Sequence, residues 1–218
     1  MQPYFVPYAG YFRLFSAADI FVAFDCVQFP RRGWVHRNRF ALDSGSTDWL
    51  TLPIRKCARE TLINDLEFAP DATASLKRSF ERFPLLRHGM QSASPLLELV
   101  ADTGAGSVAD YLCAQLMRLL EVLGISCPIV RSSTLNIASG LHGQERILAI
   151  ARQLGATRYV NSPGGRSLYD AEAFAANGIE LRFLSPYVAS MDSILTLLLM
   201  RSAGDIAALI RRETILAE

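Results

Sequence analysis

The sequence predicts an α/β fold, with a Rossmann-like, mostly parallel sheet flanked by helices and an aromatic, arginine-rich N-terminal segment that forms the site. Three observations favour this fold class. Short β-type runs alternate with helical runs from residue 128 to residue 184, which is typical of parallel β-α-β units. A capped amphipathic helix precedes them, and half of the 218 residues are apolar, enough for a sizeable core. We therefore expect one domain over residues 1–218, with a helix-rich insertion at about 71–123.

Short runs of β-type residues mark the expected strands. They lie at 20–24, 49–54, 62–68, 128–133, 157–161 and 179–184. The second and third runs indicate a hairpin or two neighbouring strands. The last three runs alternate with helical segments, so we expect them to pair in parallel.

Helical periodicity supplies the remaining elements. Helices are expected at 71–83, 107–123, 143–155, 169–178, 192–200 and 203–212. The second helix is the clearest, because Ser107 and Asp110 form a capping-box-like pair at its start and Gly124 follows its end. Pro84 is expected to stop the first helix, and the pattern over 91–106 indicates a loose connection.

Charge and targeting signals exclude several classes of protein. The 22 basic and 21 acidic residues nearly cancel, so we expect neither nucleic acid nor an anionic membrane as the main partner. The N-terminus has no basic region followed by an apolar run, so it is not a signal peptide. The longest strongly apolar stretch, 194–200, is too short to span a bilayer. We therefore expect a cytoplasmic protein without membrane insertion.

Cysteine and histidine spacing argues against a metal site. The four cysteines are widely scattered with no C-x-x-C pair, which indicates reduced thiols. His36, His88 and His142 are remote from one another in the sequence, and no other ligands cluster around them. A nucleophilic role for Cys26 is much less favoured than a buried structural thiol.

Polar and aromatic side chains crowd the segment from Gln2 to Arg39. Burying so many polar groups is costly unless a ligand or a shared hydrogen-bond network satisfies them. On an extended segment Arg37 and Arg39 point to one face and could both bind one phosphate or carboxylate, while Asn38 faces away. Two alternatives stay open: the arginines pair with surface carboxylates on an edge strand, and the aromatic residues, Trp34 included, belong to the core.

Four ordered blocks of this segment resemble the opening signature of the WbqC-like protein family. They are QPYFVPYAGYF at 2–12, FDCVQF at 24–29, RRGWVHRNR at 31–39 and WLTLPI at 49–54. The likeness continues through GQERILAIARQLGATRYVNSPGGRSLYD and NGIELRFLSPY. The resemblance implies a role in bacterial surface-polysaccharide (O-antigen) biosynthesis, where transfer of glycine or another acyl group to an amino sugar is the proposed activity.

The chain departs from the family pattern at four places. Relatives usually begin with a few apolar residues before the Q-P-Y motif, whereas Met1 directly precedes Gln2, so the first strand is missing or begins upstream. Cys26 stands where relatives have a second aspartate, and His36 where they tend to have asparagine. Thr196, in a shortened C-terminal stretch, replaces a common aspartate.

The resulting site prediction combines the resemblance with the chemistry of the residues. We expect catalytic roles for Asp25, Arg37 and Arg39, with Asp25 as a general base at the end of an apolar strand. Substrate contacts are expected from Gln2, Tyr4, Tyr8, Gln28, Trp34, His36 and Asn38. A phosphate could bind the SPGGR turn through Gly164, Gly165 and Arg166, although a plain βα turn is the more favoured interpretation.

Three functions fit these residues. The first is a transferase acting on a small anionic substrate, such as a nucleotide sugar or an activated amino acid. The second is an ATP-dependent, adenylate-forming amide ligase that resembles pantothenate synthetase, although the histidine-rich phosphate motif is replaced by PYAGYF. The third is a non-enzymatic binding protein in polysaccharide assembly. The sequence names no cofactor, and exposed apolar residues on the last two helices would provide a homodimer face.

Overall fold

The protein is a mixed α/β structure, seen here in a computed structural model that describes residues 1–104 and 106–217. The strands are β1 (Phe21–Ala23), β2 (Arg37–Ala41), β3 (Thr47–Thr51), β4 (Ile129–Arg131), β5 (Arg158–Asn161), β6 (Glu180–Leu184) and β7 (Leu216–Ala217). The helices are α1 (Arg13–Ser16), α2 (Ala72–Phe80), α3 (Pro84–Gln91), α4 (Pro95–Ala101), α5 (Val108–Leu123), α6 (Gly143–Gln153), α7 (Ala171–Ala175), α8 (Ile194–Met200) and α9 (Ala203–Glu213). Short 3-10 turns are η1 (Ala9–Phe12), η2 (Ile63–Asp65), η3 (Ser132–Thr134) and η4 (Pro163–Leu168).

In the described part of the chain the strands form three small sheets. β1 pairs in parallel with β4, and β5 pairs in parallel with β6, whose other edge takes β7 in antiparallel orientation. β2 and β3 form a separate antiparallel hairpin. Parallel pairing is therefore confirmed, but the single Rossmann-like sheet is not, because the β1–β4 pair and the β5–β6–β7 sheet remain separate.

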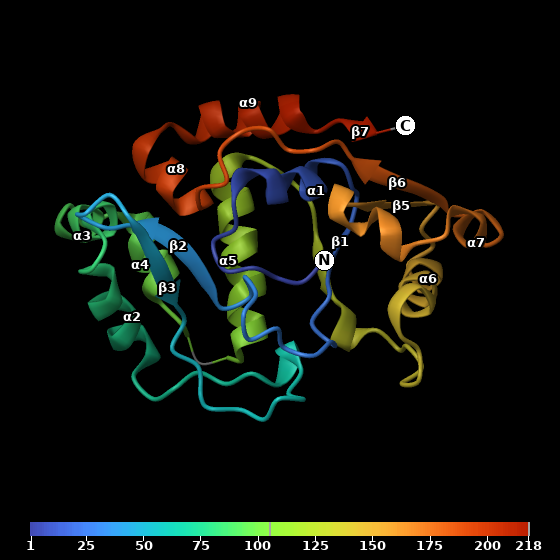
Figure 1. Ribbon diagram of the computed structural model, residues 1–218, viewed down its shortest axis with the longest axis horizontal. Coiled ribbons are helices and arrows are strands. Elements are labelled where there is room, and N and C mark those ends of the chain that lie inside the picture. The colour runs from blue at the N-terminus through green and yellow to red at the C-terminus, as the bar shows by residue number, and fades with distance from the viewer. Residues whose placement is uncertain (105, 218) are drawn as a thin grey trace.

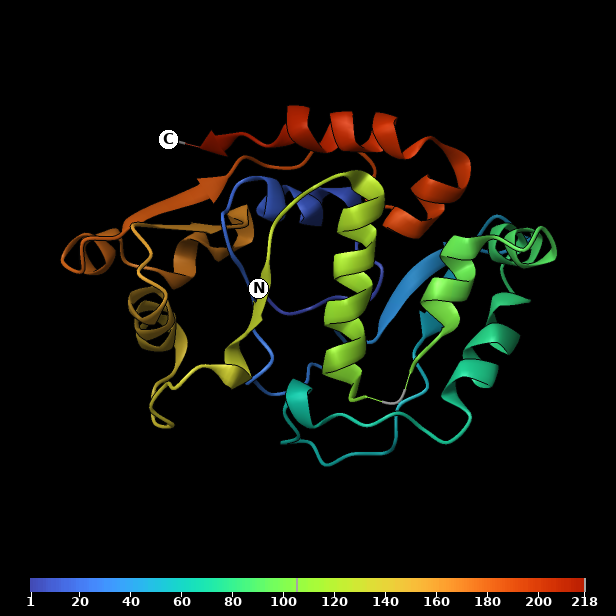
Figure 2. The same cartoon turned by 180° about the vertical axis from the view of Figure 1, so that it is seen from behind.

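Helix α5 runs through the middle of the molecule (Figures 1 and 2), where α9 crosses one of its ends. Its predicted capping box is present, since Ser107 Oγ accepts from the Asp110 amide and the Asp110 carboxylate accepts from the Ser107 amide. Gly124 ends the helix with a φ of 62°, a left-handed conformation that glycine adopts without a Cβ clash. Ten residues of α5 are buried, so this helix is the centre around which the other elements pack.

Some predicted boundaries differ from the structure. Residues 62–68 form the 3-10 turn η2 and two isolated β-bridges in place of a strand. In one of these bridges Phe68 pairs with Ile54. The expected loose connection at 91–106 contains α4, which begins at Pro95 because a proline needs no amide partner in the first turn. Pro84 likewise opens α3, whereas α2 already ends at Phe80, before the boundary expected at Pro84.

Buried apolar side chains form two unequal clusters. The larger one extends from the N-terminal turn through β2, β3 and α2–α5 to α8 and α9. The smaller one joins α6, α7 and β6, and its buried members are Ile147, Leu148, Ala151, Phe174 and Ile179. Within the described residues, no helix is long and apolar enough to cross a membrane.

Candidate functional site: an arginine and tryptophan platform

Strand β2 places two arginines on one side of the β2–β3 hairpin. Because side chains alternate along a strand, Arg37 and Arg39 share a face while Asn38, between them, is buried. In the antiparallel register Arg39 lies opposite Trp49 of β3. The guanidinium carbons of Arg37 and Arg39 lie 4.0 Å and 4.8 Å from the centre of the Trp49 ring. The predicted convergence of the two arginines is therefore seen, on an indole that the sequence had not singled out.

A second indole extends this surface. Trp34 lies 5.1 Å from Trp49 between ring centres and is 41% exposed. The Arg37 Nε donates to the Gly33 carbonyl at 3.3 Å, which fixes one edge of its guanidinium. We call Trp34, Arg37, Arg39 and Trp49 the platform. It offers two positive charges beside a partly exposed aromatic surface.

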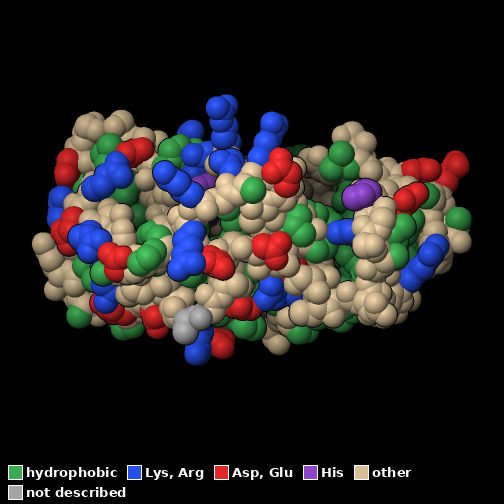
Figure 3. All heavy atoms as spheres, turned by 90° about the horizontal axis from the view of Figure 1, so that it is seen from below, with side chains coloured by type: hydrophobic (Ala, Val, Ile, Leu, Met, Phe, Trp, Pro, Cys, Tyr) green, Lys and Arg blue, Asp and Glu red, His purple; other side chains and the backbone are tan. Residues whose placement is uncertain are grey.

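The arginines of the platform keep their charge available. Among the residues that the structure describes, neither Arg37 nor Arg39 has a carboxylate oxygen within 4.0 Å. Other basic side chains are different: Arg82 pairs with Asp48, and Arg55 with Glu67. Figure 3 shows Lys and Arg side chains interspersed with Asp and Glu over the face seen from below. Positive charge alone therefore does not distinguish the platform, whereas two guanidinium groups without a carboxylate partner over one indole do.

Asn38 supports the platform from inside. Its Nδ2 donates to the carbonyls of Phe5 at 3.2 Å and Val6 at 2.7 Å, and its Oδ1 accepts from the Arg39 amide at 2.8 Å. Only 4% of Asn38 is exposed, so its side chain anchors β2 to the N-terminal turn. We expected a substrate contact here, and this geometry gives Asn38 a positioning role instead.

The N-terminal turn itself is strained and firmly held. Val6 has a φ of 37°, a left-handed value that is unfavourable for a β-branched residue. Its amide donates to Gln115 Oε1 at 2.9 Å, and its carbonyl accepts from Ser193 Oγ at 2.7 Å as well as from Asn38. The Phe5 amide donates to the Trp34 carbonyl at 3.1 Å. The turn therefore holds two segments in place: β2, which carries the two arginines, and the backbone at Trp34.

Asp25 lies at the carboxyl ends of the parallel pair β1–β4 and is fully buried. One oxygen accepts from Ser132 Oγ and the Ser133 amide, each at 2.9 Å. The other accepts from Ser133 Oγ at 2.7 Å and from Arg131 Nε at 2.6 Å. Arg131 also bonds Asp110 and is the ion-pair partner of Asp25, whereas within the described residues neither Arg37 nor Arg39 pairs with Asp25.

These bonds decide what the Asp25 carboxylate can do. Burial raises the pKa of Asp25, but the hydrogen bonds from Ser133, Arg131 and Ser132 outweigh it and hold the pKa below its ordinary value. A carboxylate is a weak base when its pKa is lowered and each of its oxygens accepts two hydrogen bonds. The geometry favours a structural role in joining β1 to β4, and the general-base role stays a prediction.

The remaining expected substrate contacts lie away from the platform. Tyr4 meets Tyr11 and Tyr8 meets Tyr187 with tilted rings, at 5.3 Å and 5.5 Å between ring centres. Gln28 Nε2 donates to the Arg59 carbonyl at 2.7 Å, and the backbone carbonyl of Gln2 accepts from the Tyr11 hydroxyl at 2.7 Å. Within the described residues, none of these side chains hydrogen-bonds or stacks with the platform. The structure therefore brings together only Trp34, Arg37 and Arg39 of the predicted set.

His36 precedes β2 but points into the core. It is 8% exposed and meets the Phe29 ring edge-on, with ring centres 4.8 Å apart. Burial lowers the pKa of His36 to about 4, and the neighbouring Arg37 acts in the same direction. The imidazole is thus neutral at physiological pH.

The SPGGR segment forms the 3-10 turn η4 between β5 and α7. A Cβ on Gly165 would lie 2.8 Å from the Asn161 side-chain nitrogen, so a larger residue there would require the Asn161 side chain to move. The Arg166 guanidinium lies 5.1 Å from the centre of the Phe183 ring, and Gly164 is exposed. This packing explains the glycine without a ligand, and phosphate binding here stays a prediction.

Sequence reasoning missed the partners that lie far along the chain. Trp49 could be found only from the β2–β3 register, and Arg131, Ser132 and Ser133 only from the β1–β4 pairing. Arg146, in the GQER block, donates to the Cys26 carbonyl at 3.1 Å and contacts its sulfur at 3.2 Å. In the described part of the chain, no group of three or more His, Cys, Asp or Glu residues could hold a metal ion.

Comparison with known proteins agrees with the resemblance seen in the sequence. The chain is 27% identical over 180 residues to the uncharacterized protein Rv1507c of Mycobacterium tuberculosis, an alignment that covers 80% of this chain and 75% of the relative. No solved structure matches the chain. The sequence model of the WbqC-like protein family matches residues 2–190, and the chain belongs to this family.

Proposed function

We propose that the protein is a transferase of bacterial surface-polysaccharide biosynthesis that holds the anionic part of an activated sugar or activated amino acid on the platform. Membership of the WbqC-like family supports the biological setting. The observation that carries the binding role is the pair of guanidinium groups over Trp49 without a carboxylate partner in the described residues.

The chemistry of the platform suits a phosphorylated ligand. Guanidinium groups form bidentate, charge-assisted hydrogen bonds with phosphate oxygens, and stacking on an indole leaves their terminal amino groups free to do so. Trp34 adds a flat apolar surface on which a sugar or a base ring can pack. A nucleotide sugar combines these two features in one molecule.

Acyl transfer to an amino sugar gives the platform a defined task. The amine nitrogen of the sugar forms an amide bond with the acyl carbon, the bond from that carbon to its activating group breaks, and the amine proton is released. The activating group leaves with negative charge. Where the activated amino acid is the ligand on the platform, fixed guanidinium groups stabilise this developing charge because they need no reorganisation during the reaction. Where the ligand is the nucleotide part of the amino sugar, they hold the acceptor in place.

A thermal-shift screen tests this proposal. Nucleotide sugars, amino acids and ATP with magnesium are added to the wild type, to Arg37→Ala and to Arg39→Ala, with Arg78→Ala as the matched control because Arg78 is exposed and lies on α2. A bound ligand raises the melting temperature by mass action. We expect a nucleotide sugar to stabilise the wild type and Arg78→Ala but neither platform variant.

Two results would contradict the proposal. Equal stabilisation of all four proteins would place the ligand away from the platform. A response to ATP with magnesium and to no nucleotide sugar would favour the adenylate-forming ligase over the transferase.

A further inference from the structure

We propose that two neighbouring loops, 28–34 and 55–61, form a peripheral docking surface for a bilayer that contains anionic lipids. Four exposed cations on these loops make up what we call the cationic patch: Arg31, Arg32, Lys56 and Arg59. The inference is independent of the ligand on the platform, because none of these four side chains belongs to the platform.

A tight turn presents the first two cations of the patch. The Gly33 amide donates to the Pro30 carbonyl at 2.8 Å, so Arg31 and Arg32 occupy the two central positions of this turn. Both side chains are exposed. The Arg31 guanidinium donates to the Cys57 carbonyl at 2.6 Å, and this bond ties the turn to the second loop.

A second turn lies beside the first. The Thr61 amide donates to the Ala58 carbonyl at 3.3 Å, which places Arg59 and Glu60 at the centre of this turn. The Phe29 amide donates to the Thr61 carbonyl at 2.9 Å, so the backbones of the two loops are joined directly. The four cations are therefore carried by one continuous surface.

The cations of the patch lack the carboxylate partners that other basic side chains have. Within the described residues, none of the four has a carboxylate oxygen within 4.0 Å. By contrast, every Lys and Arg from residue 60 to residue 131 has one. Glu60 is the only acidic residue on the two loops, and Arg55 is neutralised by Glu67. The loops therefore keep a local excess of positive charge.

A bilayer with anionic lipids matches this arrangement. Its surface attracts cations that come within a Debye length, about 8–10 Å, so the local patch decides the attraction, which the nearly balanced total charge does not reveal. Trp34 follows the first turn and is 41% exposed, and an indole beside cations is suited to the level of the lipid headgroups. In Figure 1 the chain after β3 runs along the lower edge of the molecule, and Figure 3 shows Lys and Arg side chains that project on this side.

A nucleic acid fits the patch less well. Proteins that hold a duplex through its phosphates at physiological salt commonly use about 6–10 such contacts, which is more than the cations of the patch can make. A charged bilayer instead acts on each cation through the potential of a whole leaflet, so a small patch is enough for reversible docking.

The test measures co-sedimentation of the whole chain with lipid vesicles. We expect binding to phosphatidylcholine vesicles that contain about one third phosphatidylglycerol, release in about 0.5 M salt, and no binding to phosphatidylcholine alone. Arg32→Glu with Lys56→Glu should weaken binding about tenfold or more. Arg201→Glu with Arg211→Glu is the matched control and should bind as the wild type does. It changes the net charge equally, at exposed positions next to and in α9, along the upper edge of Figure 1.

A milder variant guards against a folding defect. Arg32→Gln with Lys56→Gln removes the two charges without reversing them, so it should weaken binding less than the glutamate pair while keeping the melting temperature of the wild type.

Three outcomes would overturn the proposal. Equal weakening in the patch variant and in the control would attribute binding to total charge. Equal binding to vesicles with and without phosphatidylglycerol would show that anionic headgroups are not recognised. Binding of a DNA duplex through Arg32 and Lys56, by a chain that does not sediment with phosphatidylglycerol vesicles, would make a nucleic acid the partner.

Discussion

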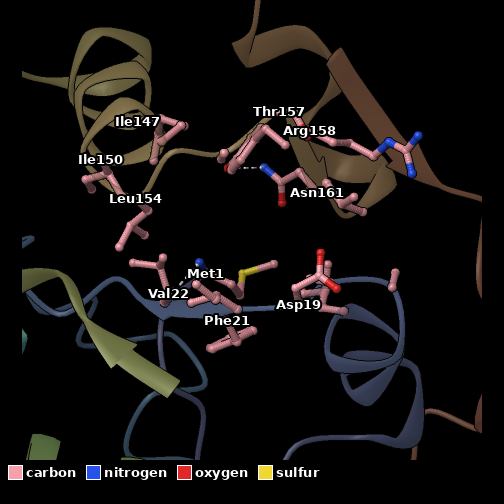
Figure 4. A pocket seen from close by; sticks show the side chains of 18 of the residues that line it. Met1, Asp19, Phe21, Val22, Ile147, Ile150, Leu154, Thr157, Arg158 and Asn161 are labelled. Atoms are coloured by element: carbon pink, nitrogen blue, oxygen red, sulfur yellow. Dashed lines mark hydrogen bonds between the residues drawn. The ribbon is translucent and has the colours of Figure 1, made fainter. Parts of the chain in front are cut away.

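The platform and the β5–β6–β7 sheet rest on cores of very different size. The β2–β3 hairpin that carries the platform packs Phe40 and Leu50 into the larger cluster, which spans most of the molecule. The β5–β6–β7 sheet shares with α6 and α7 a cluster of five buried residues, and β5 lines a cavity of about 500 Å³ that β1 borders on the opposite side (Figure 4).

The difference in cluster size indicates which parts of the molecule are more rigid. Local stability follows the number of buried apolar side chains and paired backbone groups around a segment. The platform is fixed by the hairpin, by Asn38 and by the strained turn at Val6, so its arginines are held in place before a ligand arrives. The β5–β6–β7 sheet rests on the smaller cluster and should open more easily.

The largest effect is expected from Phe174→Ala. Phe174 is fully buried in the smaller cluster and stacks on Tyr159 with ring centres 5.4 Å apart. Removing it should cost about 3–5 kcal/mol. Because the cluster is local, hydrogen exchange should quicken in α6, α7, β5 and β6 while α5 stays protected. Phe80→Ala, in the larger cluster, should instead reduce the protection of α5. A uniform loss of protection from hydrogen exchange in Phe174→Ala would show that the two clusters unfold as one cooperative unit.

Asp25→Asn is expected to have the next largest effect. It removes the charge that accepts hydrogen bonds from Ser133, Arg131 and Ser132, so the free energy of unfolding in urea should fall by about 3 kcal/mol. Asp110→Asn is the control, because Asp110 bonds the same Arg131 from an exposed position. It should change the free energy by less than about 1 kcal/mol. An equal loss of unfolding free energy in both variants would show that burial does not increase the contribution of Asp25 to stability.

The pH dependence of Asp25 has a definite sign. Its folded-state pKa lies below the ordinary 3.8, so its contribution to stability is fully present above pH 3.8 and is lost as the pH falls through the folded-state value. Acid unfolding below pH 3.8 should therefore be less steep in Asp25→Asn than in the wild type.

At mildly acidic pH, about one unit below 6.5, a smaller effect is expected from His36. Because burial lowers its pKa from 6.5 to about 4, the neutral form stabilises the fold, and this contribution is lost as the pH falls from 6.5 towards 4. The loss should approach about 1.4 kcal/mol per pH unit. His36→Gln should flatten the stability curve in this window, and His88→Gln, at an exposed position, should not. If stability still fell steeply between pH 6.5 and 4 in His36→Gln, the pH dependence would belong to another titratable group.

Local patterns predicted local structure well. The capping box of Ser107 and Asp110 and the glycine after it located α5, and alternation along β2 placed Arg37 and Arg39 on one face. These features depend on residues that are at most a few positions apart, where backbone geometry fixes the outcome.

Features that depend on strand pairing were not predictable in the same way. The partners of Asp25 lie more than 100 residues away in sequence, and Trp49 meets the arginines only through the register of the hairpin. The two separate parallel pairs also escaped prediction, because the pattern of each strand shows its burial but not its neighbour.

The central claim, that the platform binds an anionic ligand, has a direct optical test. Trp34 and Trp49 are the only two tryptophans in the sequence, so intrinsic tryptophan fluorescence reports on the platform alone. Titration with a nucleoside diphosphate sugar should change this fluorescence in a saturable way. Replacing both arginines (Arg37→Gln with Arg39→Gln) should weaken binding about tenfold or more, and Arg78→Gln should leave it unchanged. An unchanged fluorescence signal at millimolar ligand, or equal affinity in the double variant, would contradict the account.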